Sequence, residues 1–566
     1  MKKKIIIIFV IVIATICYVY IKLYNNNIKN EIEYQETEIN WENYPTYEIE
    51  LEKDLTIDKK GIYYLKGTLN GTITIDTDEN VKLVLEGVTI TSNDGPAIYV
   101  KSSKNTYIEL KEGTINKIED SEKHSNTDLD ATIYSKDDLI FTGTGKLILT
   151  ANYQDGIVSK DDLIFENGSY EITTVDDAIR GKDSVVIVDG DYNINAKGDG
   201  IKSTNETDST KGYILIQNGT FNINATTDGI DAKTNLVIKN GTFNIITGGG
   251  SVNASTKEGW GSWGTNQADS AKGIKARNDI TIENGEFNFD TADDAIHSNN
   301  DVWVKEGNIV IETGDDGIHA DNTLTIDNGT ITIKSSYEGL EGSSITINQG
   351  TIEITATDDG INAAGGNDSS AMNRPGENNY SNSNHMIEIN GGTIYINAKG
   401  DGIDSNGNIT MNDGLVIVNG PTDNGNGTLD YDGTFIVNGG TLVASGSAGM
   451  AQSPSNNSNI NSVMITFGTT IDANTLVSIK DSDGKEVITY SAEKSYQNLV
   501  ITSSLLVNGN YTIYTGGSSN TTSTYGLYET GGYTGGNQNQ SFTISSTNTT
   551  VGKTINREQP GQMERR

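Results

Sequence analysis

The sequence predicts an all-β chain folded as a parallel β-helix, with about 22 residues and three short strands in each turn. One observation is a phrase, Asp-Gly-Ile or Asp-Ala-Ile, that returns at a nearly constant spacing. The step is 22 residues from Asp155 to Asp177, from Asp177 to Asp199, and from Asp294 to Asp316. A second observation is that apolar residues keep the same places within each period. A fixed period in this range is typical of repeat proteins, whose units contact only their neighbours.

The N-terminal segment predicts export. Lys2, Lys3 and Lys4 precede an uncharged apolar run at residues 5–21. This run is at the short end for a membrane-spanning helix, and its positive flank places the N-terminus inside. The alternative is a cleaved signal peptide. Either way, we expect residues 1–21 to make the rest of the chain extracellular or cell-surface, with the membrane met through this segment only. A polar tether at residues 22–48 follows.

Residues 49–454 form the predicted β-helix. In the repeat that begins at Asp316, apolar residues alternate with polar ones, which predicts strands with an inward and an outward side. The inward pairs of this repeat are Ile318 and Ala320, Leu324 and Ile326, and Ile331 and Ile333. The outward residues between them are His319, Thr325 and Thr332. An Asn-Gly corner recurs, as at Asn218-Gly219 and Asn240-Gly241, where the chain needs a positive φ.

Antiparallel hairpins also use Asn-Gly turns. They would not explain why three-strand units repeat with constant inward positions, each of which needs a neighbouring unit to bury it. Three stretches interrupt the period, at residues 205–211, 255–270 and 366–385, and insertions in solenoids usually form surface loops.

The period ends after residue 454. Alternating strands predict a small β-rich C-terminal cap or module at residues 455–517, and residues 518–566 form a tail rich in Gly, Ser, Thr and Asn. An open β-helix end needs capping, but the pattern does not show whether this module supplies the cap.

Composition and charge exclude several classes of function. The chain has 40 basic and 76 acidic residues, a formal net charge of −36. Nucleic acid is therefore excluded as a partner, because phosphate binding needs a basic surface. Cys17 is the one cysteine, so disulfides and cysteine-based zinc sites are absent. His297, His319 and His385 do not show a zinc spacing. The oligomeric state stays open.

The acids of the repeated phrase predict a metal site. One aspartate per turn is explained by turn chemistry, but the doubled aspartates are not. Stacked turns bring these carboxylates within about 5 Å of each other, where they protonate, repel or hold a cation. Oxygen-only sites suit calcium better than zinc or copper. The predicted calcium ligands are Asp176, Asp177, Asp199, Asp228, Asp293, Asp294, Asp315, Asp316, Asp358, Asp359 and Asp401.

Four of these acids, Asp293, Asp294, Asp315 and Asp316, form the best predicted cluster. Glu338 holds the place of the acid one turn later. In the other direction, Lys272 replaces the acid 22 residues before Asp294 and breaks the column.

With the repeats, the segment Ala271 to Ala276 (Ala-Lys-Gly-Ile-Lys-Ala) and the segment Gly449 to Gln452 (Gly-Met-Ala-Gln) in view, the chain resembles a known family. It is similar to the exported carbohydrate-binding β-helix proteins of clostridia and related bacteria, over about residues 56–517. The resemblance implies a right-handed parallel β-helix like that of family 9 pectate lyases. It also implies bound calcium and binding of polysaccharide, namely cellulose and acidic pectin polymers such as polygalacturonate.

Two groups of residues are predicted to contact polysaccharide. Lys272 and Lys275 either offset the acids, grip an acidic sugar, or act as the base of a lyase. A pectate lyase uses a lysine or arginine beside calcium for β-elimination, but a lysine base needs a lowered pKa and neighbouring carboxylates raise it. Trp260, Trp263 and Trp303 are placed outside the inward positions, and exposed tryptophans stack on sugar rings or hold a loop in place.

We therefore expect an exported, surface-anchored protein whose calcium-bearing β-helix binds plant-type polysaccharide. The alternatives are a calcium-dependent pectate-type lyase and a structural adhesin without sugar specificity, since long β-helices also serve as stalks.

Overall fold

The computed structural model describes residues 32–34, 39–254, 270–363 and 385–552. It divides into a unit ending at Asn40 and a unit that begins at Trp41, and the account below concerns the second. Within the described ranges, no helix has the length and apolar character needed to span a membrane. The predicted anchor at residues 1–21 lies outside them.

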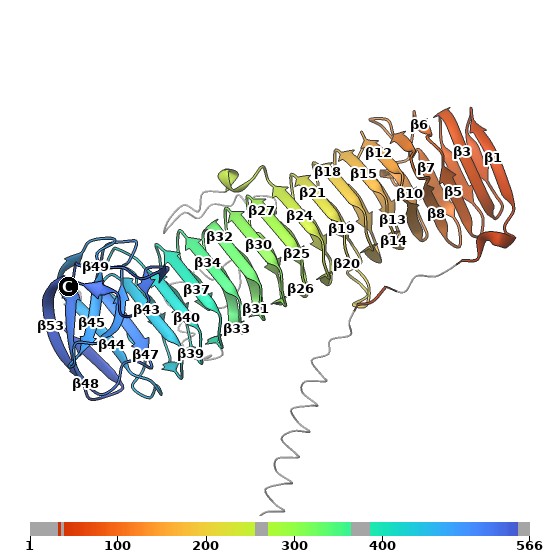
Figure 1. Cartoon of the computed structure of the whole chain (residues 1–566). Coiled ribbons are helices and arrows are strands. Elements are labelled where there is room, and N and C mark those ends of the chain that lie inside the picture. Colours follow the sequence, from red (N-terminus) through yellow and green to blue (C-terminus); the bar gives the residue numbers. More distant parts are fainter. Residues whose placement is uncertain (1–31, 35–38, 255–269, 364–384, 553–566) are drawn as a thin grey trace, which may run out of the picture. The chain divides into compact units, whose positions relative to one another are not determined.

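The structure is a parallel β-helix, as predicted, and its turns stack on one another in sequence order (Figure 1). In most turns three strands follow one another, and each pairs in parallel with the strand three places later. For example, β16 pairs with β19, β17 with β20, and β18 with β21. The strands therefore form three rows along the helix, here called row one, row two and row three.

Row one follows the repeated acidic phrase. Its strands are β2 (Leu55–Ile57), β4 (Ile73–Asp76), β7 (Ile98–Ser102), β10 (Ala131–Ser135), β13 (Asp155–Ser159), β16 (Ile179–Gly181), β19 (Ile201–Ser203), β22 (Ile230–Ala232), β25 (Ile274–Ala276), β28 (Ile296–Ser298), the first parts of β31 (Ile318–Ile326) and β33 (Leu340–Ile347), β35 (Ile361–Ala363), β38 (Ile403–Ser405) and β41 (Leu429–Tyr431).

Row two comes next along the chain. Its strands are β1 (Thr46–Leu51), β3 (Gly61–Asn70), β5 (Val81–Leu85), β8 (Thr106–Leu110), β11 (Leu139–Gly143), β14 (Asp162–Phe165), β17 (Ser184–Ile187), β20 (Tyr213–Ile216), β23 (Leu236–Ile238), β26 (Ile280–Ile282), β29 (Asp301–Val304), the second parts of β31 and β33, β36 (Met386–Ile389), β39 (Asn408–Met411) and β42 (Phe435–Val437).

Row three completes each turn. Its strands are the end of β3, β6 (Thr89–Thr91), β9 (Ile115–Glu119), β12 (Lys146–Ala151), β15 (Ser169–Thr174), β18 (Asp191–Ala196), β21 (Thr220–Ala225), β24 (Thr242–Thr247), β27 (Glu286–Thr291), β30 (Asn308–Thr313), β32 (Thr330–Ser336), β34 (Thr351–Ala356), β37 (Thr393–Ala398), β40 (Leu415–Asn419) and β43 (Thr441–Gly446). Two 3-10 helices, η1 (Trp41–Asn43) and η2 (Ser251–Asn253), lie outside the rows.

The core consists of the predicted inward residues, which stack on their equivalents in the next turn. Ile318, Ala320, Leu324, Ile326 and Ile331 are all 0% exposed. In row three, aromatic rings follow one another nearly parallel, with Tyr192 4.8 Å from Phe221 and Phe221 4.7 Å from Phe243. These distances match the spacing of paired strands, about 4.8 Å. Each turn therefore buries its apolar side chains against its neighbours.

The predicted Asn-Gly corner precedes row three, and its glycines have positive φ, for example 136° at Gly219 and 137° at Gly241. A side chain at such a φ would be strained. The predicted interruption at residues 205–211 lies between β19 and β20. The other two lie outside the described residues, apart from their end residues Ser270 and His385.

The C-terminal segment caps the helix. β47 (Tyr496–Ser503) pairs antiparallel with β43, the last strand of row three, and with β44 (Ser462–Ile471). The other strands are β45 (Val477–Asp481), β46 (Glu486–Tyr490), β48 (Gly509–Thr515), β49 (Ser518–Ser519), β50 (Ser523–Thr524), β51 (Leu527–Tyr528), β52 (Tyr533–Thr534), β53 (Asn537–Ile544) and β54 (Asn548–Val551). Pairing at β43 satisfies backbone groups that an open edge would expose.

One expectation for this region needs correction. Residues 518–551 are not a tail, because β53 pairs with β48 and β54 pairs with β44. Their low hydrophobicity is typical of an unstructured tail. In the structure, backbone hydrogen bonds pair these polar strands with more apolar strands.

The glycine of the acidic phrase gives a prediction about packing. A Cβ at Gly229 would lie 2.6 Å from Ile245 Cγ2 and 2.5 Å from the carbonyl oxygen of Gly273 in the next turn. We expect G229A to lower the free energy of unfolding by about 2–4 kcal/mol, because neither neighbour can move without shifting a turn. Denaturant unfolding measures it. The control is G468A, whose Cβ would meet nothing within 4 Å. Equal losses in the two variants would contradict this packing role.

Candidate functional site: the acid ladder and its counter-charges

The acids of the repeated phrase form a ladder just before the strands of row one. One carboxylate oxygen of each acid accepts the backbone N–H of the equivalent residue in the next turn. The distances are 3.1 Å from Asp177 N to Asp155 Oδ1, 2.8 Å from Asp199 N to Asp177 Oδ1, and 2.9 Å from Asp228 N to Asp199 Oδ1. The contact recurs later, with 2.9 Å from Asp316 N to Asp294 Oδ1. The recurring aspartate therefore has a structural function, which is to satisfy a backbone donor at the turn.

A second row of side chains faces the ladder. It is formed by the residue three places after each acid, which lies within row one and is paired in register from turn to turn. Its members are Arg180, Lys202, Asp231, Lys275, His297, His319, Glu341, Asn362, Asp404 and Asp430. We call it the facing row. Its members were not recognised in the sequence as one row, because their residue types change from turn to turn.

In the first turns, the facing row neutralises the ladder. Arg180 Nε lies 2.7 Å from Asp155 Oδ2. Lys202 Nζ lies 2.6 Å from Asp199 Oδ2 and 3.2 Å from Asp177 Oδ2. Burial is the main effect on Asp155 and raises its pKa to about 7, although Arg180 opposes the rise. Of the predicted calcium ligands, Asp177 and Asp199 thus already have a cationic side chain on the outer oxygen.

Lys275, a predicted sugar contact, also neutralises a ladder acid, further along the helix than Arg180 and Lys202. Its Nζ lies 3.1 Å from Asp228 Oδ2, and its side chain is partly buried. Asp228 also accepts the backbone N–H of Lys272 at 2.7 Å. Lys272 therefore keeps its place in the ladder through its backbone, while its side chain turns to the next acids.

The best predicted cluster, around Asp294 and Asp316, is filled with cationic and imidazole groups. Lys272 Nζ lies 2.6 Å from Asp294 Oδ2 and 2.9 Å from Asp293 Oδ1. His297 Nδ1 lies 2.8 Å from Asp294 Oδ2. Burial acts to raise the pKa of Asp294, but Lys272 and His297 outweigh it and hold that pKa well below its usual range. Side chains therefore supply the counter-charge here.

His319 was predicted to point outward, and it is 0% exposed. Its ring stacks on His297, with 4.7 Å between centroids. Its Nδ1 lies 2.6 Å from Glu341 Oε2 and its Nε2 lies 3.1 Å from Asp321 Oδ1. Burial opposes protonation, but the carboxylates of Asp316, Asp321 and Glu341 outweigh it and raise the pKa of His319. The histidine is outside the core yet covered by acids, which alternation alone does not reveal.

The last part of the ladder and of the facing row lacks such compensation. Six acids, Glu338, Asp358, Asp359, Asp401, Asp404 and Asp430, have no Lys, Arg or His nitrogen within 4.0 Å among the described residues. Burial raises the pKa of Asp359 to about 8, with further increases from Asp358, Asp401 and Asp404. Burial also raises the pKa of Asp404 to about 7, with contributions from Asp401 and Asp430. We call these six residues the acidic end.

An amide in the acidic end has an unsatisfied acceptor. Asn362 is 6% exposed, and its Nδ2 donates to Glu338 Oε2 at 2.8 Å. Its Oδ1 is buried without a hydrogen-bond partner among the described residues. Asn362 is paired in register with Asp404. A buried carbonyl oxygen beside several carboxylates is the donor set that calcium prefers, since calcium takes six to eight oxygens in flexible geometry.

The predicted aromatic contacts lie in different places. Trp303 in β29 faces outward, as expected, and is 38% exposed. Its Nε1 donates to Asp327 Oδ2 at 2.7 Å, and Lys305 Nζ lies 4.7 Å from the ring centroid. The ring is thus held by two neighbours. Trp260 and Trp263 lie outside the described residues.

Parts of this chain are similar in sequence to known proteins. A family model described as carbohydrate-binding domain-containing protein matches residues 51–317 and 315–556. A relative of that description from Acetivibrio thermocellus is 36% identical over 129 residues, which cover 21% of this chain and 45% of the relative. This match therefore spans less than half of the relative's length. A gadolinium derivative of the polysaccharide lyase-like protein from C. thermocellum is 32% identical, covers 36% of this chain and 91% of that chain, and has a TM-score of 0.35.

The acidic end predicts a pH dependence. Asp359 has a pKa of about 8 in the folded chain against an ordinary 3.8, so the folded state holds a proton that the unfolded state has lost between these values. The free energy of unfolding then decreases as pH rises from about 4 to about 8. We expect D359N, which keeps Oδ1 for the N–H of Asp401, to gain about 1–2 kcal/mol relative to the native chain between pH 5 and pH 8.

Unfolding in chelator at the two pH values measures this gain. The control is D199N, which removes an acid paired with Lys202 and should lose stability to a similar extent at both pH values. A D359N chain whose relative stability does not change with pH would show that Asp359 titrates normally.

Proposed function

This chain belongs to the family of carbohydrate-binding domain-containing proteins, and we propose that it is an exported, cell-surface protein that binds pectin and cellulose through a calcium-bearing β-helix. The observation that supports bound calcium is the acidic end, where six acids lie together without a counter-charge from the described residues. Export and membrane attachment are supported by Lys2 to Lys4 and the apolar run at residues 5–21.

Calcium would also reduce the electrostatic repulsion between this acidic chain and an acidic ligand. A chain with a net charge of −36 repels an acidic polymer such as polygalacturonate. Glu338, Asp359, Asp404 and the free Oδ1 of Asn362 would hold the ion. Calcium takes six to eight oxygen ligands, and these four residues supply fewer than that if each gives one oxygen. Carboxylate and hydroxyl groups of a uronic acid can complete the coordination. The ion would then join two acidic partners.

Binding without cleavage is the activity that the site supports. The lyase alternative requires a neutral base beside the metal. Lys272 Nζ lies 2.9 Å from Asp293 Oδ1 and 2.6 Å from Asp294 Oδ2. Two carboxylates this close favour the ammonium form, which has no lone pair to accept a proton. The facing row at the acidic end contains acids and an amide, with no lysine or arginine from Glu341 to Asp430.

The calcium proposal predicts chelator-sensitive binding. We expect the native chain to bind polygalacturonate in calcium and to lose this binding in chelator. The double variant D359N/D404N should bind calcium at least about tenfold more weakly, because it removes two charged ligands while keeping an oxygen at each place. Calorimetric titration with calcium and pull-down on polygalacturonate measure the two effects.

The matched control is D199N, which changes an acid already paired with Lys202. Equal calcium affinity in D359N/D404N and the native chain would overturn the assignment of the ion to the acidic end. Release of unsaturated products, seen as ultraviolet absorbance, would show that the chain is a lyase.

A further inference from the structure

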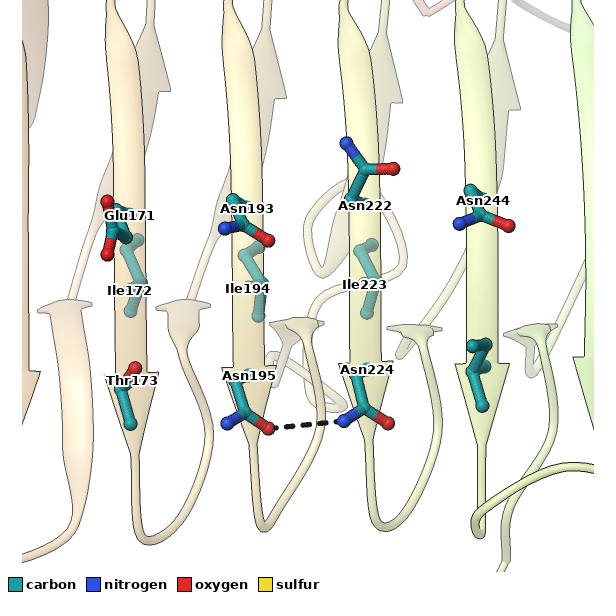
Figure 2. Close-up of a pocket in the computed structure, with 11 residues that line it drawn as sticks. Glu171, Ile172, Thr173, Asn193, Ile194, Asn195, Asn222, Ile223, Asn224 and Asn244 are labelled. Atoms are coloured by element: carbon teal, nitrogen blue, oxygen red, sulfur yellow. Dashed lines mark hydrogen bonds between the residues drawn. The ribbon is translucent and has the colours of Figure 1, made fainter.

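A cluster of asparagines lies on the outer face of row three, away from the acid ladder. The second and third outward positions of β18, β21 and β24 are Asn193 and Asn195, Asn222 and Asn224, and Asn244 and Ile246. All five asparagines are exposed. Figure 2 shows their amides projecting from adjacent strands on the same face of the sheet. We call this surface the amide face. It borders a shallow hollow of about 350 Å³.

The fold does not require asparagine at these positions. Asparagine is disfavoured in strands, and an outward position accepts most polar or β-branched residues. In β27 the equivalent places hold Asn288 and Asp290, and further along the same row they hold Val310 and Glu312 in β30 and Thr332 and Ser335 in β32. Asparagine therefore holds the second outward position on four successive turns, from Asn193 to Asn288, and this concentration needs another explanation.

The amides do not satisfy one another. Asn224 Nδ2 donates to Asn195 Oδ1 at 3.3 Å, and Asn288 Nδ2 donates to Asn244 Oδ1 at 2.9 Å. Asn193 and Asn222 make no side-chain hydrogen bond to another described residue. Each amide offers two donors and an acceptor. Most of this hydrogen-bonding capacity thus points to the outside.

The charge of the face defines its ligand. Among the outward residues of β18, β21 and β24, Asp191 is the one charged group, and it lies at the first position of its strand. Acids follow on both sides, with Glu171 in β15 and Asp290 in β27. An uncharged centre with acidic borders disfavours a polyanion, offers no countercharge to a cation, and suits a neutral partner rich in hydroxyl groups.

Elsewhere on row three, the outer face of the sheet is covered by the C-terminal module. At β37 the outward Tyr395 stacks on Tyr525 of the C-terminal module, with 4.6 Å between ring centroids, and Ile417 in β40 is 0% exposed. Hydrogen bonds accompany this packing, as from Glu493 N to Asn419 Oδ1 at 3.0 Å. Protein contacts on row three therefore combine an aromatic and aliphatic part with hydrogen bonds. The outward residues of the amide face include no aromatic side chain and one aliphatic side chain, Ile246, so the face lacks the apolar part of such a protein contact.

We propose that the amide face binds a single chain of uncharged polysaccharide, independently of calcium. The inference rests on the proposed function, that this chain binds pectin and cellulose, and assigns the uncharged polymer to a second surface away from the acidic end. Amide rows repeat about every 4.8 Å across the strands and about every 6.6 Å along them. Successive sugar hydroxyls can thus exchange hydrogen bonds with Asn193, Asn222 and Asn244 in adjacent turns.

The test is a triple variant, N193T/N222T/N244T, with threonine chosen because it favours strands. The probe is hydroxyethylcellulose, an uncharged soluble glucan, in native affinity electrophoresis with chelator present. We expect the native chain to be retarded and the triple variant to bind about tenfold or more weakly, because a shorter hydroxyl with one donor replaces an amide with two donors at each of three places. Calcium-dependent binding of polygalacturonate should be unchanged. The matched control, T330A/T332A in β32 of the same row, should bind hydroxyethylcellulose like the native chain.

Each other outcome is decisive. Hydroxyethylcellulose binding that the triple variant retains would overturn the amide face and leave the proposed function intact. A native chain that binds polygalacturonate alone would also overturn it. A native chain that binds neither polymer would overturn the proposed function as well. A change in sedimentation between the native chain and a folded triple variant would identify the face as a contact between copies of this chain, against the proposal.

Discussion

The stacking of each turn on the next, in register and about 4.8 Å apart, is the constraint on which every other feature depends. It makes the nearest neighbour of a side chain the residue that holds the same place one turn away. Apolar places then become a continuous core, in which Tyr192, Phe221 and Phe243 stack ring on ring. Charged places become columns, and a column of like charge must take up protons, counter-charges or cations.

The period, the inward residues and the glycine corner could be predicted from the sequence because one residue type returns at each of those places. The facing row could not be found in this way, since Arg180, Lys202, Asp231 and Lys275 share one register position while their charge changes. Following a position instead of a residue type would have found it. The same reasoning applies to His297 and His319, whose spacing of 22 residues places their rings together but matches no zinc pattern within one turn.

The two oxygens of a ladder aspartate have different functions. Oδ1 accepts a backbone N–H from the next turn, as Asp177 does for Asp199 at 2.8 Å. This contact explains why the residue recurs whether or not a ligand is present. The recurrence of the aspartate is therefore weak evidence for a metal site. The partner of its outer oxygen, Oδ2, is the stronger evidence. This oxygen meets a cationic side chain at Asp199 and Asp294, whereas at Asp359 burial and further acids leave the charge uncompensated. The physical case for a cation thus moves from the cluster around Asp294 to the acidic end.

The amide face follows from the same stacking, applied to neutral groups. Because each row has its own neighbours, the outward places of row three can change without disturbing the ladder before row one. A β-helix can therefore carry a charged edge and an uncharged face on the same turns, as shown by Asp199 just before β19 and Asn222 in β21 of the same turn. Under the two proposals, divalent ions would govern ligand binding at the acidic end and would have no function at the amide face. A polymer with both acidic and neutral stretches could then contact both surfaces of one chain.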